Sequence, residues 1–186
     1  NHLIELTKRN KDLMVITPAM AGGSKLLKYQ ELFPNNFIDA GIAEEHALVL
    51  ANGMSIEGLI PFVSIYSTFL QRGYDQVIHD IARMNTHVII GIDRAGIVGE
   101  DGETHQGTLD MSFFRLVPNL TIMAPKDFRE LEDMLEFAVN LGKPVVIRYP
   151  RGGEGKEKFE KHKEIMKLLK WGKENISTGA SSDITN

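Results

Sequence analysis

The chain has 186 residues, of which 42% are hydrophobic, and a formal net charge of −4, which suits one domain with a sizeable core. It has no cysteine, which excludes disulfides, thiolate metal sites and a thiol nucleophile. No Lys/Arg run is interleaved with aromatic residues, and no apolar run approaches the roughly 18 residues of a membrane span. We therefore expect a cytoplasmic protein that binds neither nucleic acid nor membrane.

Short β-rich runs alternate with longer segments of helical period along the chain. The apolar runs predict strands at 13–17, 36–39, 60–63, 87–92, 120–123 and 144–148. The segments between them predict helices at 23–33, 43–57, 67–84, 108–116 and 127–141. This alternation predicts an α/β fold, a mainly parallel sheet flanked by helices on both faces.

Capping residues mark several of these helix ends. Asp127 stands in the N-cap position before an apolar helical pattern, and Gly142 is a C-terminal stop before Pro144. Ser67 is an N-cap candidate for the helix predicted at 67–84.

The composition changes after residue 153. Residues 154–170 are dominated by Lys and Glu, and the residues beyond are polar or small. We expect one domain over 1–153 and a charged linker and polar tail over 154–186, leading toward an absent C-terminal domain. The first residue is not Met, so we expect a fragment or a processed piece of a longer protein.

The 93–107 loop is the segment that most strongly indicates function. It reads DRAGIVGEDGETHQG and follows the apolar run 88–92. A loop with this many glycines is costly in backbone entropy. Ligands of parallel sheets bind beyond the carboxyl ends of the strands, so we expect an active-site loop.

The charged residues of the loop allow two interpretations. One is a metal site at Glu100, Asp101, Glu103 and His105. Acids in a loop also arise from solvation and Asx turns, and the calcium-loop template is not matched, so we predict no metal site here. Arg94 follows a buried strand, where a guanidinium suits an anion.

A second anion site is predicted at the end of the last strand. Arg148 and Arg151 flank a Tyr-Pro pair there, and two glycines follow Arg151. Arg94 and Arg151 together favour a phosphorylated substrate over a neutral one.

Glu44 and the 65–76 segment stand at two other strand-to-helix junctions. An acid such as Glu44 in a first helical turn complements the helix dipole, but this helix is apolar enough to be buried. A protonated Glu44 would then be able to donate a hydrogen bond to a ring nitrogen. In the 65–76 segment, Phe69 and Tyr74 suit core packing, and Arg72 and Asp75 suit a surface pair.

Several strings of the sequence resemble a known enzyme family. GIAEEH at 41–46 and GEDGETHQ at 99–106 resemble the pyrimidine-binding domain of transketolase-type thiamine-diphosphate enzymes. ITPAM at 16–20, IYSTFLQRGYDQ at 65–76, the whole 93–107 loop and RYPRG at 148–152 resemble the 1-deoxy-D-xylulose-5-phosphate synthase family. The resemblance covers about residues 1–153 and indicates the central domain alone.

The resemblance implies a transferase that condenses pyruvate with glyceraldehyde 3-phosphate, with loss of carbon dioxide, in isoprenoid and thiamine biosynthesis. It implies thiamine diphosphate and Mg²⁺ as cofactors, held mainly by an N-terminal domain with a GDG…N motif that this chain lacks. The C-terminal domain is absent as well. We therefore expect a homodimer-forming fragment that is inactive alone.

The resemblance also implies roles for single residues. Glu44 would hydrogen-bond the aminopyrimidine ring of the cofactor, and Phe69 would pack near that ring. Tyr66, Arg94 and Arg151 would hold the phosphate of the acceptor substrate.

Further matching positions lie in the same motifs. His105 would lie near the reacting carbons as a catalytic and substrate-binding residue, with Asp101 beside it. Arg72 matches a family position near the site, and Glu45 stands where a neutral amide is common.

Two other interpretations remain open. One is the small subunit of a split transketolase, which would use a ketose donor in place of pyruvate; the 65–76 string argues against it. The other is a non-catalytic interaction domain, which the presence of Glu44, Arg94 and His105 disfavours.

Overall fold

The apolar runs pair into one sheet in the computed structural model, which describes residues 1–153; the expected linker and tail at 154–186 lie outside the described residues. The strand order is β2-β1-β3-β4-β6-β5, and every neighbouring pair is parallel. The strands are β1 (Leu13–Thr17), β2 (Phe37–Asp39), β3 (Ile60–Tyr66), β4 (Ile89–Asp93), β5 (Thr121–Met123) and β6 (Val145–Arg148).

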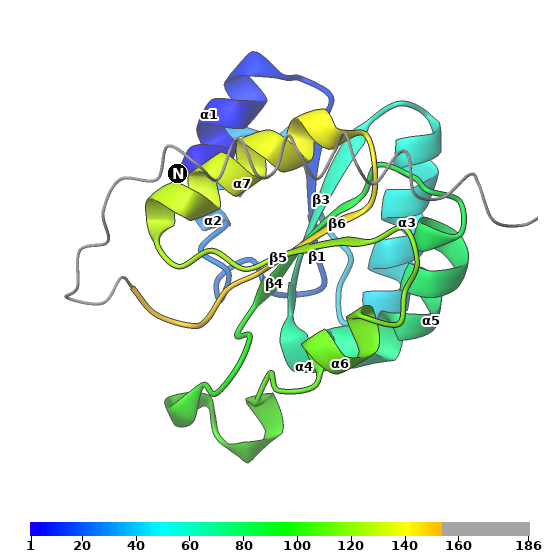
Figure 1. Cartoon of the computed structure of the whole chain (residues 1–186). Coiled ribbons are helices and arrows are strands. Elements are labelled where there is room, and N and C mark those ends of the chain that lie inside the picture. The colour runs from blue at the N-terminus through cyan, green and yellow to red at the C-terminus, as the bar shows by residue number, and fades with distance from the viewer. Residues whose placement is uncertain (154–186) are drawn as a thin grey trace, which may run out of the picture. The chain divides into compact units, whose positions relative to one another are not determined.

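Helices connect consecutive strands, as a parallel sheet requires. The predicted α/β fold with helices on both faces is confirmed: α1 and α7 cover one face and α3 and α5 the other (Figure 1). The α-helices are α1 (His2–Arg9), α2 (Leu27–Leu32), α3 (Glu44–Ile56), α4 (Ser67–Leu70), α5 (Tyr74–Gln76), α6 (Asp110–Phe114) and α7 (Phe128–Leu141). None of the helices within residues 1–153 is long and apolar enough to cross a membrane.

A hydrophobic core lies between the sheet and α3. Strands β3 and β4 are buried along nearly their whole length, as the inner strands of a covered parallel sheet are. The buried residues of this core, each no more than 7% exposed, are Ile16, Ala47, Leu48, Ala51, Val63, Ile65, Leu70, Val77, Ile81, Ala82, Val88, Ile90, Ile92, Phe114, Val117 and Val146.

The helix predicted at 67–84 is divided into four short pieces. Between α4 and α5 lies the 3₁₀ turn η2 (Gln71–Gly73), and a π-helical segment, η3 (Val77–Ala82), follows α5. Gly73 allows the chain to approach α3 closely, because a Cβ there would lie 2.2 Å from Leu48 Cδ1. The continuous helical period in the sequence does not reveal this contact.

The predicted caps of α7 are confirmed, and the predicted N-cap at Ser67 is wrong. Asp127 is confirmed as the N-cap of α7, since its side chain accepts from the backbone N–H of Glu130, and Gly142 ends that helix in the left-handed conformation. Ser67 is not an N-cap: it is the first residue of α4, and Tyr66 occupies the cap position.

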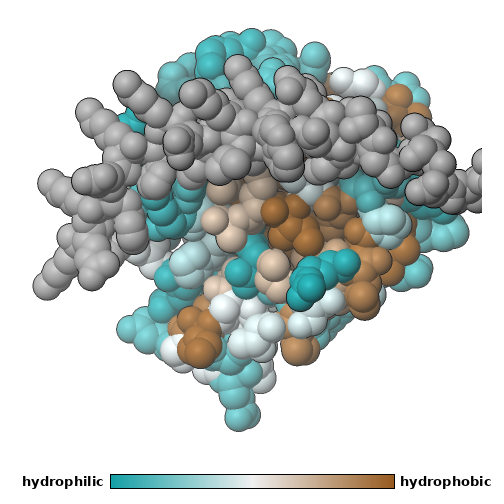
Figure 2. Space-filling model, viewed as in Figure 1, coloured by the Kyte–Doolittle hydropathy of each residue, from teal (hydrophilic) through white to brown (hydrophobic). Residues whose placement is uncertain are grey.

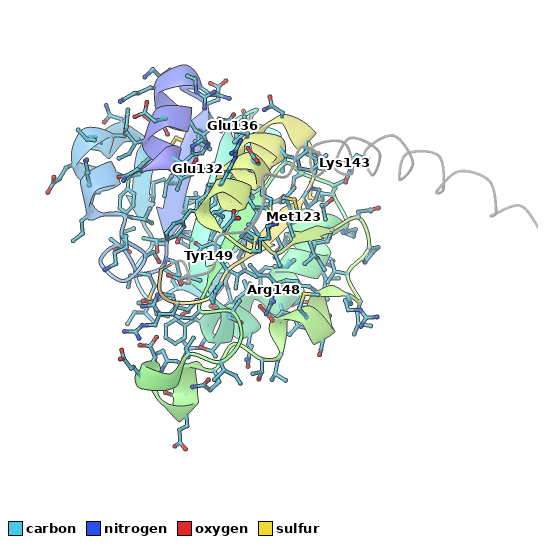
Figure 3. All side chains as sticks on the ribbon, turned by 60° about the vertical axis from the view of Figure 1, so that its left-hand side comes forward. Met123, Glu132, Glu136, Lys143, Arg148 and Tyr149 are labelled. Atoms are coloured by element: carbon cyan, nitrogen blue, oxygen red, sulfur yellow. The ribbon has the colours of Figure 1, made fainter. Side chains whose placement is uncertain are left out.

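Helix α1 was not predicted. It packs against α7 at the amino end of the chain, where Arg9 pairs with Glu136 and His2 Nε2 lies 3.2 Å from the same carboxylate. Figure 3 shows Glu132 and Glu136 on α7. A short helix held by contacts to a distant element leaves a weak local signal in the sequence.

Candidate active site

The carboxyl ends of three neighbouring strands bring the predicted site residues to one edge of the sheet. Tyr66 ends β3 and is in register with Asp93, the last residue of β4. Strand β6 ends at Arg148, opposite Ile92 of β4. The 93–107 loop leaves this edge and extends away from the sheet (Figure 1), so its position agrees with the expected active-site loop.

Backbone contacts close the base of the loop. Gly96 and Gly107 exchange two N–H···O bonds, both 2.7 Å. Ala95 donates to the carbonyl of Tyr149, which ties the loop to the end of β6. Gly107 must be a glycine here, because a Cβ would lie 2.1 Å from Arg94 O and 2.7 Å from Ser67 Cβ. The glycines therefore serve close packing as well as bending.

Side chains and short helical turns order the tip of the loop. Two 3₁₀ turns, η4 (Gly99–Asp101) and η5 (Glu103–His105), follow each other around Gly102, whose φ is +81°. The Gln106 side chain spans them, accepting from Val98 N at 2.9 Å and donating to Gly102 O at 2.7 Å.

Arg94 lies at the centre of the site. Its guanidinium carbon is 3.8 Å from the centroid of the Tyr66 ring, a cation–π contact. Its Nη1 is 2.6 Å from Asp93 Oδ2, and its Nε is 3.0 Å from Asp101 Oδ2. The Tyr66 ring thus packs against the Arg94 guanidinium, and the carboxylates of Asp93 and Asp101 pair with it.

Asp101 joins the two arginines of the predicted anion site. Its second oxygen lies 3.3 Å from Arg151 Nε, and Arg151 Nη1 is 2.7 Å from Glu100 Oε2. These carboxylates raise the pKa of Arg151, chiefly through the Glu100 hydrogen bond. Asp101 and Glu100 therefore act as partners of cations, and the described residues contain no cluster suited to hold a metal ion.

An aromatic cluster lines the same region. The rings of Tyr66 and Phe69 stack at a centroid distance of 5.3 Å. The His105 ring meets Phe69 edge-on at 5.3 Å and Tyr66 at 6.5 Å. His105 Nδ1 shares a 2.8 Å hydrogen bond with Thr104 Oγ1, so its orienting partner is a hydroxyl and not one of the loop acids.

Glu44 begins α3 and is almost fully buried, with 3% of its surface exposed. One carboxylate oxygen accepts from Arg72 Nη1 at 3.3 Å. Arg72 therefore pairs with Glu44, in place of the surface pair with Asp75 that its spacing suggested. Arg72 and Phe69 lie three residues apart in the 65–76 segment. Because Arg72 contacts Glu44 and Phe69 belongs to the aromatic cluster, this segment connects the two parts of the site.

Arg148 does not join the anion site. It makes a two-pronged contact with Asp110, Nε to Oδ2 at 3.0 Å and Nη2 to Oδ1 at 3.1 Å. Figure 3 shows it beside Tyr149 at the end of β6. Asp110 is fully buried at the start of α6, so this ion pair anchors the helix that follows the loop.

Sequence reasoning missed two residues of the site. Asp93 was assigned to the loop, but it ends β4 and is 8% exposed; burial raises its pKa, and Arg94 opposes that shift. Gly23 was assigned to a helix, but it lies in a turn where a Cβ would sit 2.0 Å from Tyr66 Oη. Burial also raises the pKa of Tyr66. The Asp-Arg pair at the end of the predicted strand is the sequence feature that could have identified Asp93 as a residue of the site.

Comparisons with known proteins show the family of this chain. Residues 1–154 match the protein family described as "Transketolase, pyrimidine binding domain". The 1-deoxy-D-xylulose-5-phosphate synthase of Natranaerobius thermophilus is 55% identical over 152 residues, 81% of this chain and 24% of that protein. The synthases of Listeria monocytogenes and Aquifex aeolicus are 48% and 51% identical, over 92% and 85% of this chain and 28% and 26% of theirs. The chain thus spans about a quarter of the length of these relatives.

Solved structures show the same fold. A split-gene transketolase, described as an inactive β4 tetramer, aligns with a TM-score of 0.74 and 27% identity, over 86% of this chain and 51% of that one. The transketolase of Campylobacter jejuni aligns with a TM-score of 0.73 and 20% identity, over 83% of this chain and 25% of that one.

Proposed function

Because this chain belongs to the family of transketolase pyrimidine-binding domains, we propose that it supplies the pyrimidine half of the active site of a 1-deoxy-D-xylulose-5-phosphate synthase. The whole enzyme would condense pyruvate with glyceraldehyde 3-phosphate and release carbon dioxide. The observation that carries this choice is the identity of 48–55% to synthases of that name across the described domain.

The residues present fit the aminopyrimidine end of thiamine diphosphate. Glu44 offers a buried carboxylate at a helix start, and Phe69 offers an aromatic face in the neighbouring segment. When bound, thiamine diphosphate supplies a nucleophilic carbon and an electron sink for decarboxylation. Glu44 would hold the proton shared with the pyrimidine ring, and Arg72 would keep the Glu44 side chain oriented. Mg²⁺ and the diphosphate would be held by a domain outside this chain.

The arginine pair would hold the acceptor substrate. Arg94 and Arg151 lie on opposite oxygens of Asp101, so their charges are close enough to share one phosphate. The Tyr66 ring packs against the Arg94 guanidinium through its face. His105, fixed by Thr104 at Nδ1, would present Nε2 to the reacting carbons.

A variant of Glu44 tests the catalytic assignment. In the full-length protein that carries this chain, Glu44→Gln should lower kcat by about 10²–10⁴-fold, the usual contribution of a general acid–base group. Glu45→Gln is the matched control, because Glu45 is exposed and points about 100° away on the same helix. Full activity in Glu44→Gln would remove this assignment.

Substrate assays separate this function from its alternatives. We expect the full-length protein to form 1-deoxy-D-xylulose 5-phosphate from pyruvate and glyceraldehyde 3-phosphate, and the 186-residue chain to form none. Turnover with a ketose donor only would favour the split-transketolase reading, which the likeness to a split-gene transketolase also supports. A folded full-length protein inactive with both donors would indicate an interaction domain.

A further inference from the structure

Asp93 uses both oxygens of its carboxylate on the residue that follows it. Oδ1 accepts the backbone N–H of Arg94 at 2.7 Å, and Oδ2 lies 2.6 Å from Arg94 Nη1. Asp93 is 8% exposed, and the Arg94 side chain is 12% exposed. A buried charge is stable only when it is paired and hydrogen-bonded. The Asp93 carboxylate and the Arg94 guanidinium therefore each depend on the other as a partner.

The backbone of Arg94 needs such support. Its φ is +58°, in the left-handed region that a residue with a Cβ seldom adopts. The hydrogen bond from its N–H to Asp93 fixes the peptide at this turn. One carboxylate therefore controls both the backbone and the charged end of Arg94.

The remaining contacts of Arg94 show which of its donors has no partner among the described residues. Nε is directed to Asp101, and Nη1 to Asp93 and, at 3.5 Å, to Gly23 O. The Tyr66 ring covers one face. Within residues 1–153, no hydrogen bond or ion pair engages Arg94 Nη2, so this group is the donor left for a ligand.

Arg151 has the same arrangement. Its Nε faces Asp101 and its Nη1 faces Glu100. Each oxygen of the Asp101 carboxylate thus contacts the Nε of one of the two arginines. The two Nη1 partners differ in burial: the Asp93 side chain is 11% exposed, whereas that of Glu100 is 83% exposed. The buried partner fixes the rotation of Arg94 about the Asp101 contact more firmly.

We propose that Asp93 is a positioning residue that holds the Arg94 guanidinium with Nη2 toward the phosphate of the acceptor, and so sets the preference for phosphorylated acceptors. This rests on the proposed function of the site.

Two effects of Asp93 on anion binding have opposite signs, which makes the proposal testable. Removing its charge leaves the site more positive by one unit, which favours any anion. Removing it also frees Arg94 to turn, which disfavours a phosphate that needs a fixed donor. A hydrogen bond to a charged group is worth about tenfold to a hundredfold in affinity, so we expect the loss of positioning to dominate.

The test uses Asp93→Asn in the full-length enzyme, with glyceraldehyde 3-phosphate and unphosphorylated glyceraldehyde as acceptors. Asparagine keeps the shape and can still accept the Arg94 N–H, but it lacks the charge. The KM for glyceraldehyde 3-phosphate should rise about tenfold or more, while the KM for glyceraldehyde and for pyruvate and the kcat stay within about twofold. Asp127→Ala is the control: it removes a distant helix cap and should lower the Tm without changing acceptor preference.

Other results would overturn the proposal. An unchanged or lower KM for glyceraldehyde 3-phosphate would show that Asp93 only reduces the charge of the site. Equal losses with both acceptors would indicate a structural role. If Asp93→Asn does not fold, Arg94→Lys carries the test, because lysine keeps the charge without the fixed fork and must reproduce the selective loss.

Failure of the proposed function can be told apart from failure of this inference. A wild-type enzyme that does not use glyceraldehyde 3-phosphate would contradict the function itself. Inorganic phosphate titrated against wild type and Asp93→Asn then tests Asp93 separately. Weaker binding by the variant supports positioning, and equal Kd values would overturn it.

Discussion

The charged residues at the carboxyl edge of the sheet perform two different tasks. Arg148 neutralises the fully buried Asp110 and anchors α6. Arg94 and Arg151 share Asp101, and each keeps donors for a ligand. A buried ion pair broken on one side costs about 3–5 kcal/mol, so Arg148 belongs to the stability of the domain, whereas Arg94 and Arg151 belong to its proposed chemistry.

His87 gives a prediction at the same scale, for pH dependence. It precedes β4, and its Nε2 lies 2.7 Å from the carbonyl of Ala138 in α7. Burial lowers its pKa from the ordinary 6.5, against an opposing effect of that hydrogen bond. The unfolded chain therefore takes up this proton at higher pH than the folded one. The stability that neutral His87 contributes is complete above about pH 6.5 and declines as the pH falls below it.

Urea unfolding of the wild type and of His87→Gln at about pH 7.5 and about pH 5.5 checks this linkage. The wild type should lose more free energy of unfolding on acidification than the variant, since every other group titrates in both. An identical loss in the two proteins would show that His87 is not linked to folding.

At the scale of elements, α7 shows how local chemistry fixes a helix end. Asp127 Oδ1 accepts from Glu130 N at 2.8 Å, and Glu130 Oε2 accepts from Lys126 N at 2.6 Å. The two contacts resemble a capping box, except that Glu130 accepts from Lys126, the residue before the N-cap, and not from the N-cap Asp127 itself. The helix buries one face on the sheet and ends at a left-handed Gly142.

Asp127→Ala should lower the free energy of unfolding by about 1 kcal/mol, because it leaves a helix N–H without its acceptor. Asp127→Asn should cost less, since asparagine is as good an N-cap. Chemical denaturation of the three proteins measures both values. Equal stability of wild type and alanine variant would mean that water satisfies this helix end.

At the scale of the whole molecule, the described domain carries large hydrophobic side chains that are exposed. Figure 2 shows apolar side chains gathered on the face that carries β5 and α6. Leu109, Met111 and Leu116, in or beside α6, are 55%, 37% and 78% exposed. Exposed apolar patches of this kind mark interaction sites, and we propose a homodimer or higher association.

Sedimentation of the chain over a range of concentrations tests this association. Leu116→Glu should weaken it, whereas Leu32→Glu, at an exposed leucine of α2, should not. A strictly monomeric wild type at high concentration would contradict the proposal.

Much of the fold could be predicted from the sequence because its signals are local. All six strands and most helices follow from apolar periodicity, and the ends of α7 follow from Asp127 and Gly142. The site was predicted less completely. The strings that resemble a family marked Glu44, Tyr66 and Arg94, but Asp93 was placed in the loop and Arg72 was paired with the wrong acid.

The sequence by itself determined which segments become strands and helices and which family they resemble, because periodicity, caps and motifs depend on residues near one another in the chain. Only the tertiary structure decided the partners: Asp101 between Arg94 and Arg151, Arg72 with Glu44, and Arg148 with Asp110. Such pairs join residues up to 50 positions apart, and they form only where the parallel strands bring their carboxyl ends to one edge. The short-range pattern of the sequence therefore does not predict these ion pairs.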